Sequence, residues 1–250
     1  MKYVIPDIHG GYRALKQCLE LVSFDYENDE LFTLGDYFDG WEESILVIEE
    51  LLKIKKRISL LGNHDSWVQD YLLGRLSTKA SLYQTSEMDL WLYNRGESTK
   101  KEIDANPNKK EMLINFLKDC KFYHTDEQQN LYVHAGFDIR TPIESQPPRE
   151  LIWGRKLSRY IIELYKQNKS LKNGYSVKRL KALDKYNQIY LGHTYCGETP
   201  ICVANVNLLD SGCGYGDGKL TIMNVITKEY KQSDLLKDLY NESILREMWK

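Results

Sequence analysis

Three short apolar runs near the start of the chain constrain its fold most strongly, because each one ends at a glycine or proline followed by side chains of metal-binding types. These side chains are Asp7 and His9 after the first run, Asp36 after the second and Asn63 after the third. Such a run is typical of a buried strand that ends in a functional loop. In open α/β sheets, ligands bind beyond the carboxyl ends of the strands. The pattern therefore predicts that these four side chains meet at one edge of a sheet.

Each predicted strand is followed by apolar residues at helical spacing, which predicts a helix after every strand. The first helix is expected over residues 11–22. The second is expected after the Asp36 loop, with Trp41 and Leu52 on the same face, and the third around Trp67 to Leu72. Repeats of strand, polar loop and helix favour an α/β fold with parallel neighbouring strands. Further strands are expected at residues 131–133, 188–191, 206–209 and 220–225. A last helix is expected to have Ser233 as its N-cap and Ile244 and Met248 on its buried face.

Residues 74–119 depart from this pattern, because they are polar and irregular apart from one helical run at residues 112–117. We expect one domain over residues 1–250, in which residues 74–119 form a partly helical cap insertion over the site. The alternative is an excursion that only covers the edge of a sheet.

Composition and charge narrow the classes of partner and compartment. The net charge is −2, from 34 basic and 36 acidic residues, so charge does not indicate binding to duplex nucleic acid and leaves small molecules or proteins as substrates. The 5 cysteines are scattered and odd in number, which suits a reducing compartment. No apolar run is long enough to span a membrane, and no signal peptide is apparent. We expect a cytoplasmic protein of unknown oligomeric state.

Histidine placement strengthens the prediction of a metal site. His9, His64, His134 and His193 all stand beside the Gly or Asp that ends a predicted strand, whereas His124 lacks this context. A single histidine of this kind is usually structural, but four in one context favour a shared chemical role.

Two divalent cations about 3.5 to 4 Å apart need one shared carboxylate and two separate ligand sets. Asp36 is the natural bridge between the metals. The remaining candidate ligands are Asp7 and His9 on one side, and Asn63, His134 and His193 on the other. Imidazole, carboxylate and amide ligands without thiolate suit manganese, iron or zinc better than calcium or magnesium. Manganese is our first expectation, although the sequence does not rank the three.

Five motifs, in this order, resemble those of the calcineurin-like metallophosphoesterases. They are Asp7-x-His9, Gly35-Asp36-x-x-Asp39, Gly62-Asn63-His64-Asp65, His134-Ala135-Gly136 and Gly192-His193-Thr194. Within that superfamily the chain resembles the serine/threonine phosphoprotein phosphatases, in particular small phage and bacterial enzymes of the lambda phosphatase type. Residues 151–155 and 208–212 extend the likeness, which covers nearly the whole chain.

The resemblance implies a fold and a mechanism. The fold would be two mixed β-sheets packed as a sandwich, with helices outside and two metals at one edge. The first metal would be held by Asp7, His9 and Asp36, and the second by Asp36, Asn63, His134 and His193. A hydroxide that bridges the metals would attack phosphorus, His64 would be the general acid oriented by Asp39, and Arg155 would bind the substrate phosphate.

Two of these roles have simpler alternatives. Asp39 can be a helix N-terminal carboxylate that stabilises the dipole of the following helix. Arg155 can be a surface arginine at the start of a helix.

The sequence departs from the family pattern after Asp39. Related phosphatases read Gly-Asp-x-Val-Asp-Arg-Gly, and that arginine binds the substrate phosphate through two hydrogen bonds. Here Asp39 is followed by Gly40 and Trp41, so the arginine is missing from its usual place. Its absence should weaken binding of phosphomonoesters unless Arg95 or Arg13 reaches the site. Tyr215, in a glycine-rich turn, is a further candidate, although a turn aromatic more often only packs.

Three functions remain open at this point. The first is a metal-dependent phosphomonoesterase, serine/threonine phosphatase-like, acting on phosphoproteins or small phosphoesters. The second is a nucleotide-directed hydrolase that cuts dinucleoside polyphosphates or cyclic phosphodiesters, because Gly40 leaves space and Trp41 can stack on a base. The third, more remote, is a module that binds phosphate without turnover.

Overall fold

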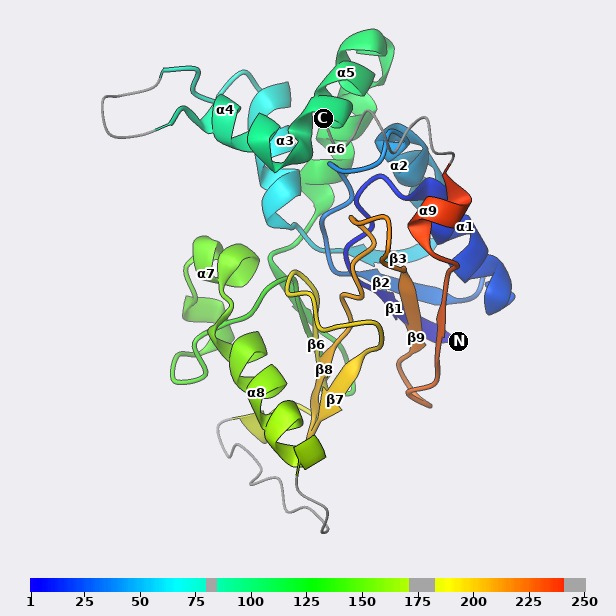
Figure 1. The fold of residues 1–250 in the computed structure, drawn as a ribbon, viewed down its shortest axis with the longest axis vertical. Helices are drawn as coiled ribbons and strands as arrows, with labels where there is room; N and C mark the ends of the chain where they lie inside the picture. The colour runs from blue at the N-terminus through cyan, green and yellow to red at the C-terminus, as the bar shows by residue number, and fades with distance from the viewer. Residues whose placement is uncertain (80–84, 171–182, 241–250) are drawn as a thin grey trace.

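Two mixed β-sheets lie face to face, with helices on both outer faces (Figure 1). The structure is a computed structural model that describes residues 1–79, 85–170 and 183–240. Over these residues each sheet has five strands. The α/β class expected from the strand and helix pattern is confirmed, and so is the sandwich implied by the resemblance.

The first sheet contains the three strands that open the chain. Its order is β10 (Tyr230–Gln232), β9 (Thr221–Asn224), β1 (Lys2–Ile5), β2 (Glu30–Thr33) and β3 (Lys56–Ser59). β1, β2 and β3 are parallel, with Val4 opposite Phe32, whereas β9 pairs with β1 in the antiparallel sense. The parallel arrangement brings the carboxyl ends of β1, β2 and β3 to one edge, as the sequence predicts.

The second sheet is formed by the later strands. Its order is β4 (Tyr123–Thr125), β5 (Leu131–Val133), β6 (Ile189–Leu191), β8 (Val206–Leu208) and β7 (Ile201–Val203). β5, β6 and β8 are parallel to one another, and β4 and β7 are antiparallel to their neighbours. The loops after β5 and β6 therefore leave this sheet at one edge.

Alternation along the strands divides the core into layers, because successive strand residues point to opposite faces. In β1, Tyr3 and Ile5 join the helix-facing core, while Val4 belongs to the cluster between the sheets. In β5, Val133 joins the core of the second helix layer, whereas Tyr132 lies between the sheets. Apolar burial on both faces fixes the register of each strand.

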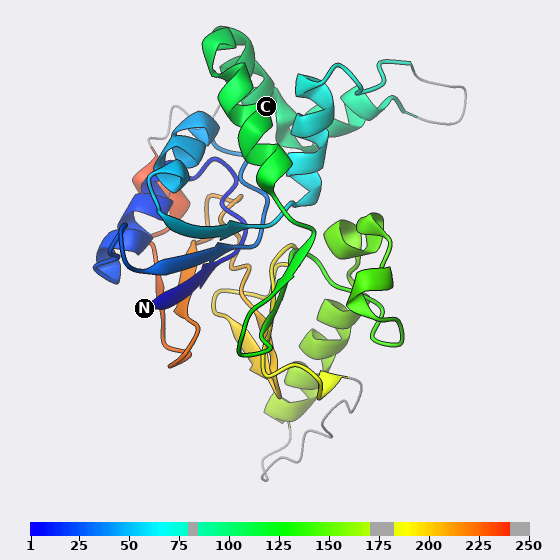
Figure 2. The ribbon, with the colours of Figure 1, turned by 180° about the vertical axis from the view of Figure 1, so that it is seen from behind.

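Helices cover the outer faces and one end of the sandwich. Beside the first sheet lie α1 (Tyr12–Leu21), α2 (Ser44–Leu52) and α9 (Leu236–Leu239), and beside the second lie α7 (Pro148–Trp153) and α8 (Lys156–Ser170). Above the first sheet stand α3 (Asn63–Leu72), α4 (Glu87–Trp91), α5 (Glu97–Ala105) and α6 (Lys110–Asp119), as Figure 2 shows from behind. Short helical turns are η1 (Leu92–Gly96), η2 (Pro107–Lys109) and η3 (Ile143–Ser145). No helix among the described residues is long and apolar enough to cross a membrane.

Three details of the sequence prediction need correction. Residues 87–105 are helical rather than irregular, since α4, η1 and α5 occupy them. α2 begins only at Ser44, so Trp41 precedes it, and Leu52 is 43% exposed. Ser233 does not cap the last helix, because α9 follows Leu235 and the Ser233 hydroxyl accepts a hydrogen bond from Leu220 N. Ile244 and Met248 lie outside the described residues.

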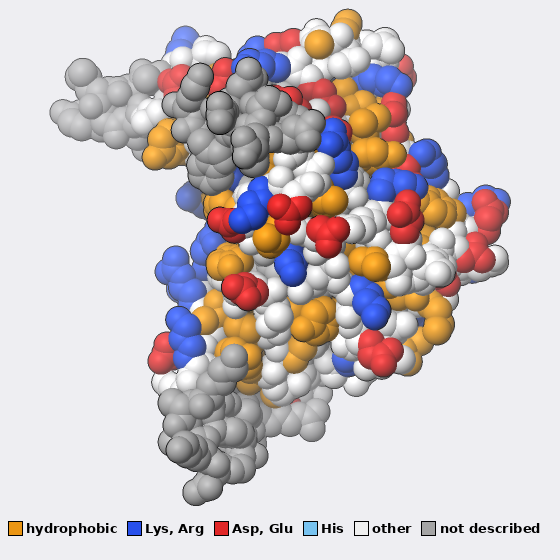
Figure 3. Space-filling view, turned by 45° about the vertical axis from the view of Figure 1, so that its right-hand side comes forward, with side chains coloured by type: hydrophobic (Ala, Val, Ile, Leu, Met, Phe, Trp, Pro, Cys, Tyr) orange, Lys and Arg blue, Asp and Glu red, His pale blue; other side chains and the backbone are white. Residues whose placement is uncertain are grey.

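The described surface mixes charges of both signs. On the face drawn in Figure 3, acidic and basic side chains are interspersed, with no broad block of one sign. This agrees with the net charge of −2 and gives no support for a duplex nucleic-acid partner on that face.

Candidate metal centre

Left-handed backbone marks several loops that follow the strands. Four predicted site residues have positive φ: His9 (49°), Asp36 (51°), Asp39 (67°) and His193 (61°). Residues other than glycine seldom adopt this conformation, and it gathers at functional sites where surrounding contacts hold it. The loops are thus shaped to direct particular side chains.

The imidazoles of His9 and His134 are oriented by backbone carbonyls. His9 Nδ1 lies 3.0 Å from Phe38 O, and His134 Nδ1 lies 2.9 Å from Leu34 O, so each Nδ1–H donates to a carbonyl. The Nε2 atoms are then unprotonated and lie 3.8 and 3.5 Å from Asp36 Oδ2. This is the tautomer required of a metal ligand.

Asp36 lies at the centre of the predicted ligand set. His9 Nε2 is 3.9 Å from Asp7 Oδ2, and His134 Nε2 is 3.1 Å from Asn63 Oδ1. Asp36 and His134 also form, with His193, a buried group whose ligand atoms all lie within 4.8 Å of one another. The structure therefore brings all six predicted ligands to one place. Three of them lie in the loops after β1 and β2, one lies at the start of α3, and two lie in the loops after β5 and β6 of the second sheet.

Backbone contacts join the two halves of this group. Asp7 Oδ1 accepts a hydrogen bond of 2.8 Å from His193 N, which links the loop after β1 to the loop after β6. Gly62 packs so closely on Asp36 that an added Cβ would lie 2.0 Å from Asp36 Oδ1. Asp65 accepts hydrogen bonds from the backbone N–H of Asp36 and Gly62 and so ties two loops together.

Burial and mutual repulsion shape the protonation of the group. Burial, with the charge of Asp210 next in importance, raises the pKa of Asp7, and burial followed by the charge of Asp7 raises the pKa of Asp36. Burial lowers the pKa values of His9 and His134 to about 3 and also lowers the pKa of His193. Neutral imidazoles and crowded carboxylates are the state that a divalent cation stabilises.

His193 provides an independent test of fit to a metal. Its Nε2 atom is buried and has no hydrogen-bond partner in the part of the chain that the structure describes. A buried nitrogen without a partner is costly unless something else binds it. A ring nitrogen of His193 also lies within 4.8 Å of ligand atoms of Asp36 and His134, so this residue fits a ligand role and the donor set suits a metal.

His64 and Asp39 form a hydrogen-bonded pair beside this group. His64 Nδ1 lies 2.7 Å from Asp39 Oδ2, and Asp39 is fully buried. His64 also falls within 4.8 Å of the ligand atoms of His9 and Asp36. Asp39 lies ahead of α2, which begins at Ser44, so the geometry does not support a role in the dipole of that helix.

Two residues that the sequence analysis missed hold Asp39 in place. Trp91 Nε1 donates to Asp39 Oδ2 at 2.8 Å, and Thr99 Oγ1 accepts from Asp39 N at 2.8 Å. Both belong to the helical insertion, and Trp91 is 52 residues from Asp39 in sequence. The insertion therefore contacts the site and does more than cover a sheet edge. No local sequence signal marks these contacts.

Arg155 lies on the side of the second sheet. Its Nη1 donates to His193 O at 3.1 Å, and its neighbour Trp153 packs edge-on against the His193 ring. Arg155 lines a cavity of about 510 Å³ between α7 and α8, together with Arg149, Lys156, Arg159 and four other residues. This placement beside a candidate ligand differs from that of a solvated surface arginine.

The predicted substitutes for the missing arginine behave differently. Arg13 donates hydrogen bonds to Glu43 Oε1 and to Leu239 O, so it does not line the site.

Trp41 is fully buried, stacks on Tyr240 and donates its indole N–H to Cys213 O, so the prediction that it stacks on a base is wrong.

Arg95 does reach the site. It lines a cavity of about 170 Å³ with His9, Asp39, His64, Tyr93, Asn94, Gly214 and Tyr215. Tyr215 is 54% exposed and lines this cavity, so it does not only pack.

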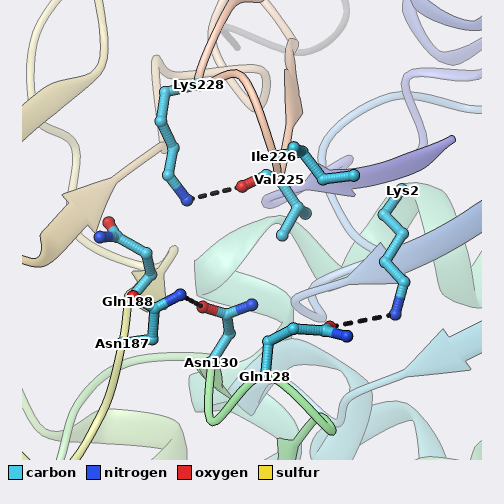
Figure 4. A pocket seen from close by; sticks show the side chains of 8 residues that line it. All are labelled: Lys2, Gln128, Asn130, Asn187, Gln188, Val225, Ile226 and Lys228. Carbon is cyan, nitrogen blue, oxygen red and sulfur yellow. Dashed lines mark hydrogen bonds between the residues drawn. The ribbon is translucent and has the colours of Figure 1, made fainter.

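A further cavity, of about 500 Å³, opens at the opposite edge of the sheets (Figure 4). It is lined by the first residue of β1 and by residues that precede β5 and β6 or follow β9, among them Lys2, Asn130, Gln188 and Lys228. The candidate ligands follow the carboxyl ends of parallel strands, so this cavity is separate from the candidate metal centre.

Comparison with known proteins agrees with the geometry. Residues 3–197 match the family model described as calcineurin-like phosphoesterase. A Pseudomonas putida protein named symmetrical bis(5'-nucleosyl)-tetraphosphatase is 24% identical over an alignment that covers 94% of this chain and 93% of its own length.

Solved structures share the fold. A protein provisionally assigned as a diadenosine tetraphosphatase superposes with a TM-score of 0.61 at 17% identity, covering 92% of this chain and 91% of its own. A protein serine/threonine phosphatase from Saccharomyces cerevisiae superposes with a TM-score of 0.56 at 13% identity, covering 93% and 79%. At such identities the likeness concerns the fold alone.

Proposed function

The chain belongs to the calcineurin-like phosphoesterase family and is a phosphoric ester hydrolase, and we propose that its substrates are nucleotides, with dinucleoside polyphosphates first among them. The observation that carries this proposal is the likeness to a symmetrical bis(5'-nucleosyl)-tetraphosphatase along nearly the whole chain. The lack of an arginine after Asp39 weighs against the phosphomonoesterase, since it removes a two-pronged contact to the phosphate of a phosphomonoester.

The six gathered side chains would hold two divalent cations. We assign Asp7, His9 and Asp36 to one metal, and Asp36, Asn63, His134 and His193 to the other, with manganese expected first. When bound, such cations neutralise phosphate oxygens and lower the pKa of water at the site, so that hydroxide is available near neutral pH.

The side chains around the metals would position the substrate and move a proton. We assign His64 as the general acid, because Asp39 accepts from its Nδ1 and leaves Nε2 to donate to a departing oxygen. We assign Arg155 to a phosphate oxygen of the substrate, where a guanidinium gives strong, directional hydrogen bonds.

A second candidate function is hydrolysis of phosphomonoesters, including phosphoserine and phosphothreonine in proteins. The pair of His64 and Asp39 favours it, because an alkoxide leaving group requires a proton, whereas a phosphate leaving group requires it less.

A substrate panel with metal analysis on the same sample tests the proposal. Manganese-loaded protein would be assayed with diadenosine tetraphosphate, a serine/threonine phosphopeptide and a cyclic nucleotide. We expect the largest kcat/KM for the tetraphosphate, with adenosine diphosphate as the sole nucleotide product. A kcat/KM that is larger for the phosphopeptide would reverse the order of the two functions. Bound metal without hydrolysis of any compound would favour the non-catalytic module.

Domain limits and compartment are also proposed here. We treat residues 1–250 as one domain with a cap insertion around residues 74–119. The 5 cysteines are free, which supports a reducing compartment such as the cytoplasm.

A further inference from the structure

We infer that Arg95 binds a phosphate of the leaving group and so makes the site selective for phosphate leaving groups over alcohols. This inference rests on the proposed function and deepens it. In symmetrical hydrolysis of a dinucleoside tetraphosphate, the oxygen of water bonds to an inner phosphorus and the central P–O bond breaks. The leaving group is then a nucleoside diphosphate, whose terminal phosphate keeps the oxygen of the broken bond. A proton that comes from the attacking water, directly or through the general acid, balances the charge on that oxygen.

The backbone places Arg95 against the position that lacks an arginine. Arg95 O accepts a hydrogen bond from Gly40 N, which follows Asp39 directly. Gly40 has φ of 109°, a conformation that strains any residue with a side chain. An arginine is therefore disfavoured at residue 40 itself, and the insertion supplies one from a different part of the chain to the same corner of the site.

The chain around Arg95 adopts an unusual shape. Helical geometry breaks at Asn94 and at Arg95, whose φ is 73° and ψ is 18°, between the end of α4 and the start of α5. On either side of the break, Trp91 and Thr99 are anchored to Asp39. Strained backbone of this kind persists where neighbouring contacts hold it, often at ligand sites. The break directs residue 95 away from the helix axis toward the cavity it lines.

The guanidinium of Arg95 is held at the glycine-rich turn. Its Nη1 donates to Gly214 O, and its Cζ lies 4.5 Å from the centre of the Tyr215 ring. Contact with an aromatic face and a carbonyl restricts the side chain before any ligand binds, which reduces the entropy cost of binding an anion.

The position of His64 identifies which part of the substrate lies here. His64, the proposed acid, lines the same cavity as Arg95, whereas Arg155 lines a separate cavity and donates to His193 O. A general acid must face the leaving oxygen. Arg95 is therefore on the leaving-group side of the reacting phosphorus, and it lines a different cavity from Arg155.

Binding of a product measures this role without turnover. Adenosine diphosphate would be titrated calorimetrically into manganese-loaded wild type, Arg95→Ala, Arg95→Lys and the control Arg75→Ala. Arg75 is an exposed arginine that pairs with Asp70 and does not line the cavity, so Arg75→Ala removes the same charge elsewhere in the chain. We expect Arg95→Ala to raise the Kd about 10- to 100-fold, the range of one hydrogen bond to a charged group, and Arg95→Lys to raise it less. Arg75→Ala should match wild type.

Turnover of two substrates completes the test. Arg95→Ala should lower kcat/KM for diadenosine tetraphosphate by a similar factor but change that for p-nitrophenyl phosphate less than about threefold, because the latter has no second phosphate. Equal losses on both substrates, or an unchanged Kd for adenosine diphosphate, would overturn the role of Arg95 and leave it a structural link between the insertion and the glycine-rich turn. Failure of wild type to cleave the tetraphosphate would instead refute the proposed function, and the Kd comparison would still decide the role of Arg95.

Discussion

His64 lies beside the candidate ligands but has its own partner, Asp39, which separates acid catalysis from metal binding. Replacing His64 with Ala should lower turnover of alkyl phosphomonoesters by about 10² to 10⁴, because their leaving group needs the proton. Turnover of p-nitrophenyl phosphate should fall far less, since p-nitrophenolate is a weak base. Steady-state rates with both substrates and elemental analysis check this. Equal losses, or loss of metal, would remove His64 from the acid role.

Trp91 orients Asp39 through one hydrogen bond and also packs against Gly96 and Tyr71. A Trp91→Phe change should keep most of the packing and lose that bond. We expect a stability loss of about 1 kcal/mol, unchanged metal content and a lower rate on alkyl phosphomonoesters. A rate like that of wild type would show that Asp39 needs no support from the insertion.

The sequence could predict the gathered residues because each follows a strand end, where chain order and sheet topology bring side chains together. Asp7, Asp36 and His193 are examples. It could not predict Trp91 and Arg95 as partners of the site, because their positions depend on how the insertion folds back. Trp41 was misassigned since local sequence does not show that Tyr240 and Cys213 enclose it.

At the scale of elements, α5 is joined to the start of α2 by one carboxylate. Glu102 Oε2 and Oε1 accept hydrogen bonds from Ser44 N and Ile45 N, two backbone groups at the α2 N-terminus. Burial outweighs these bonds and raises the pKa of Glu102 from 4.5 to about 7.

This shift predicts a pH dependence of stability. A carboxyl whose pKa is higher in the folded state stabilises the fold below its unfolded pKa, and this contribution is lost as pH rises through the folded pKa. Wild type should therefore lose stability between about pH 4.5 and pH 7 through Glu102. Glu102→Gln, neutral throughout, should lose less over the same range. Thermal unfolding of both proteins across this pH range checks the prediction. Stability that falls equally with pH in wild type and in Glu102→Gln would contradict it.

Element limits were predictable where apolar spacing is strong. The strands β1, β2, β5 and β6 and the helices α1, α3 and α6 lie close to their predicted positions. α4 and α5 were missed because few of their side chains are buried: Trp91 in α4, and Thr99 and Ile103 in α5. Helices that bury so little apolar surface leave a weak periodic signal.

Across the whole molecule, an aromatic stack joins the two sheets. Phe32 of the first sheet stacks on Tyr132 of the second with ring centres 4.0 Å apart, and Tyr190 stacks on the other side at 5.0 Å. Tyr132 also donates its hydroxyl to Asp126 at 3.0 Å. Because the candidate ligands come from both sheets, packing between the sheets positions the metal centre as well as the fold.

Tyr132→Ala should therefore affect stability and metal binding together. We expect a loss of about 3 to 5 kcal/mol in the free energy of unfolding, typical of removing a large buried ring, and weaker retention of metal. Tyr132→Phe should cost only about 1 kcal/mol, that of its hydrogen bond, and retain metal normally. Denaturant unfolding and elemental analysis check both. Metal retention as strong in Tyr132→Ala as in wild type would show that the ligand loops hold their positions without the stack.

The central claim is that side chains from both sheets hold two cations around Asp36. Elemental analysis after exhaustive dialysis of manganese-loaded protein tests it most directly. We predict about two divalent ions per chain in wild type, and a marked loss in Asp36→Asn at unchanged secondary structure. One ion or fewer in wild type, or full retention in Asp36→Asn, would contradict the two-metal centre.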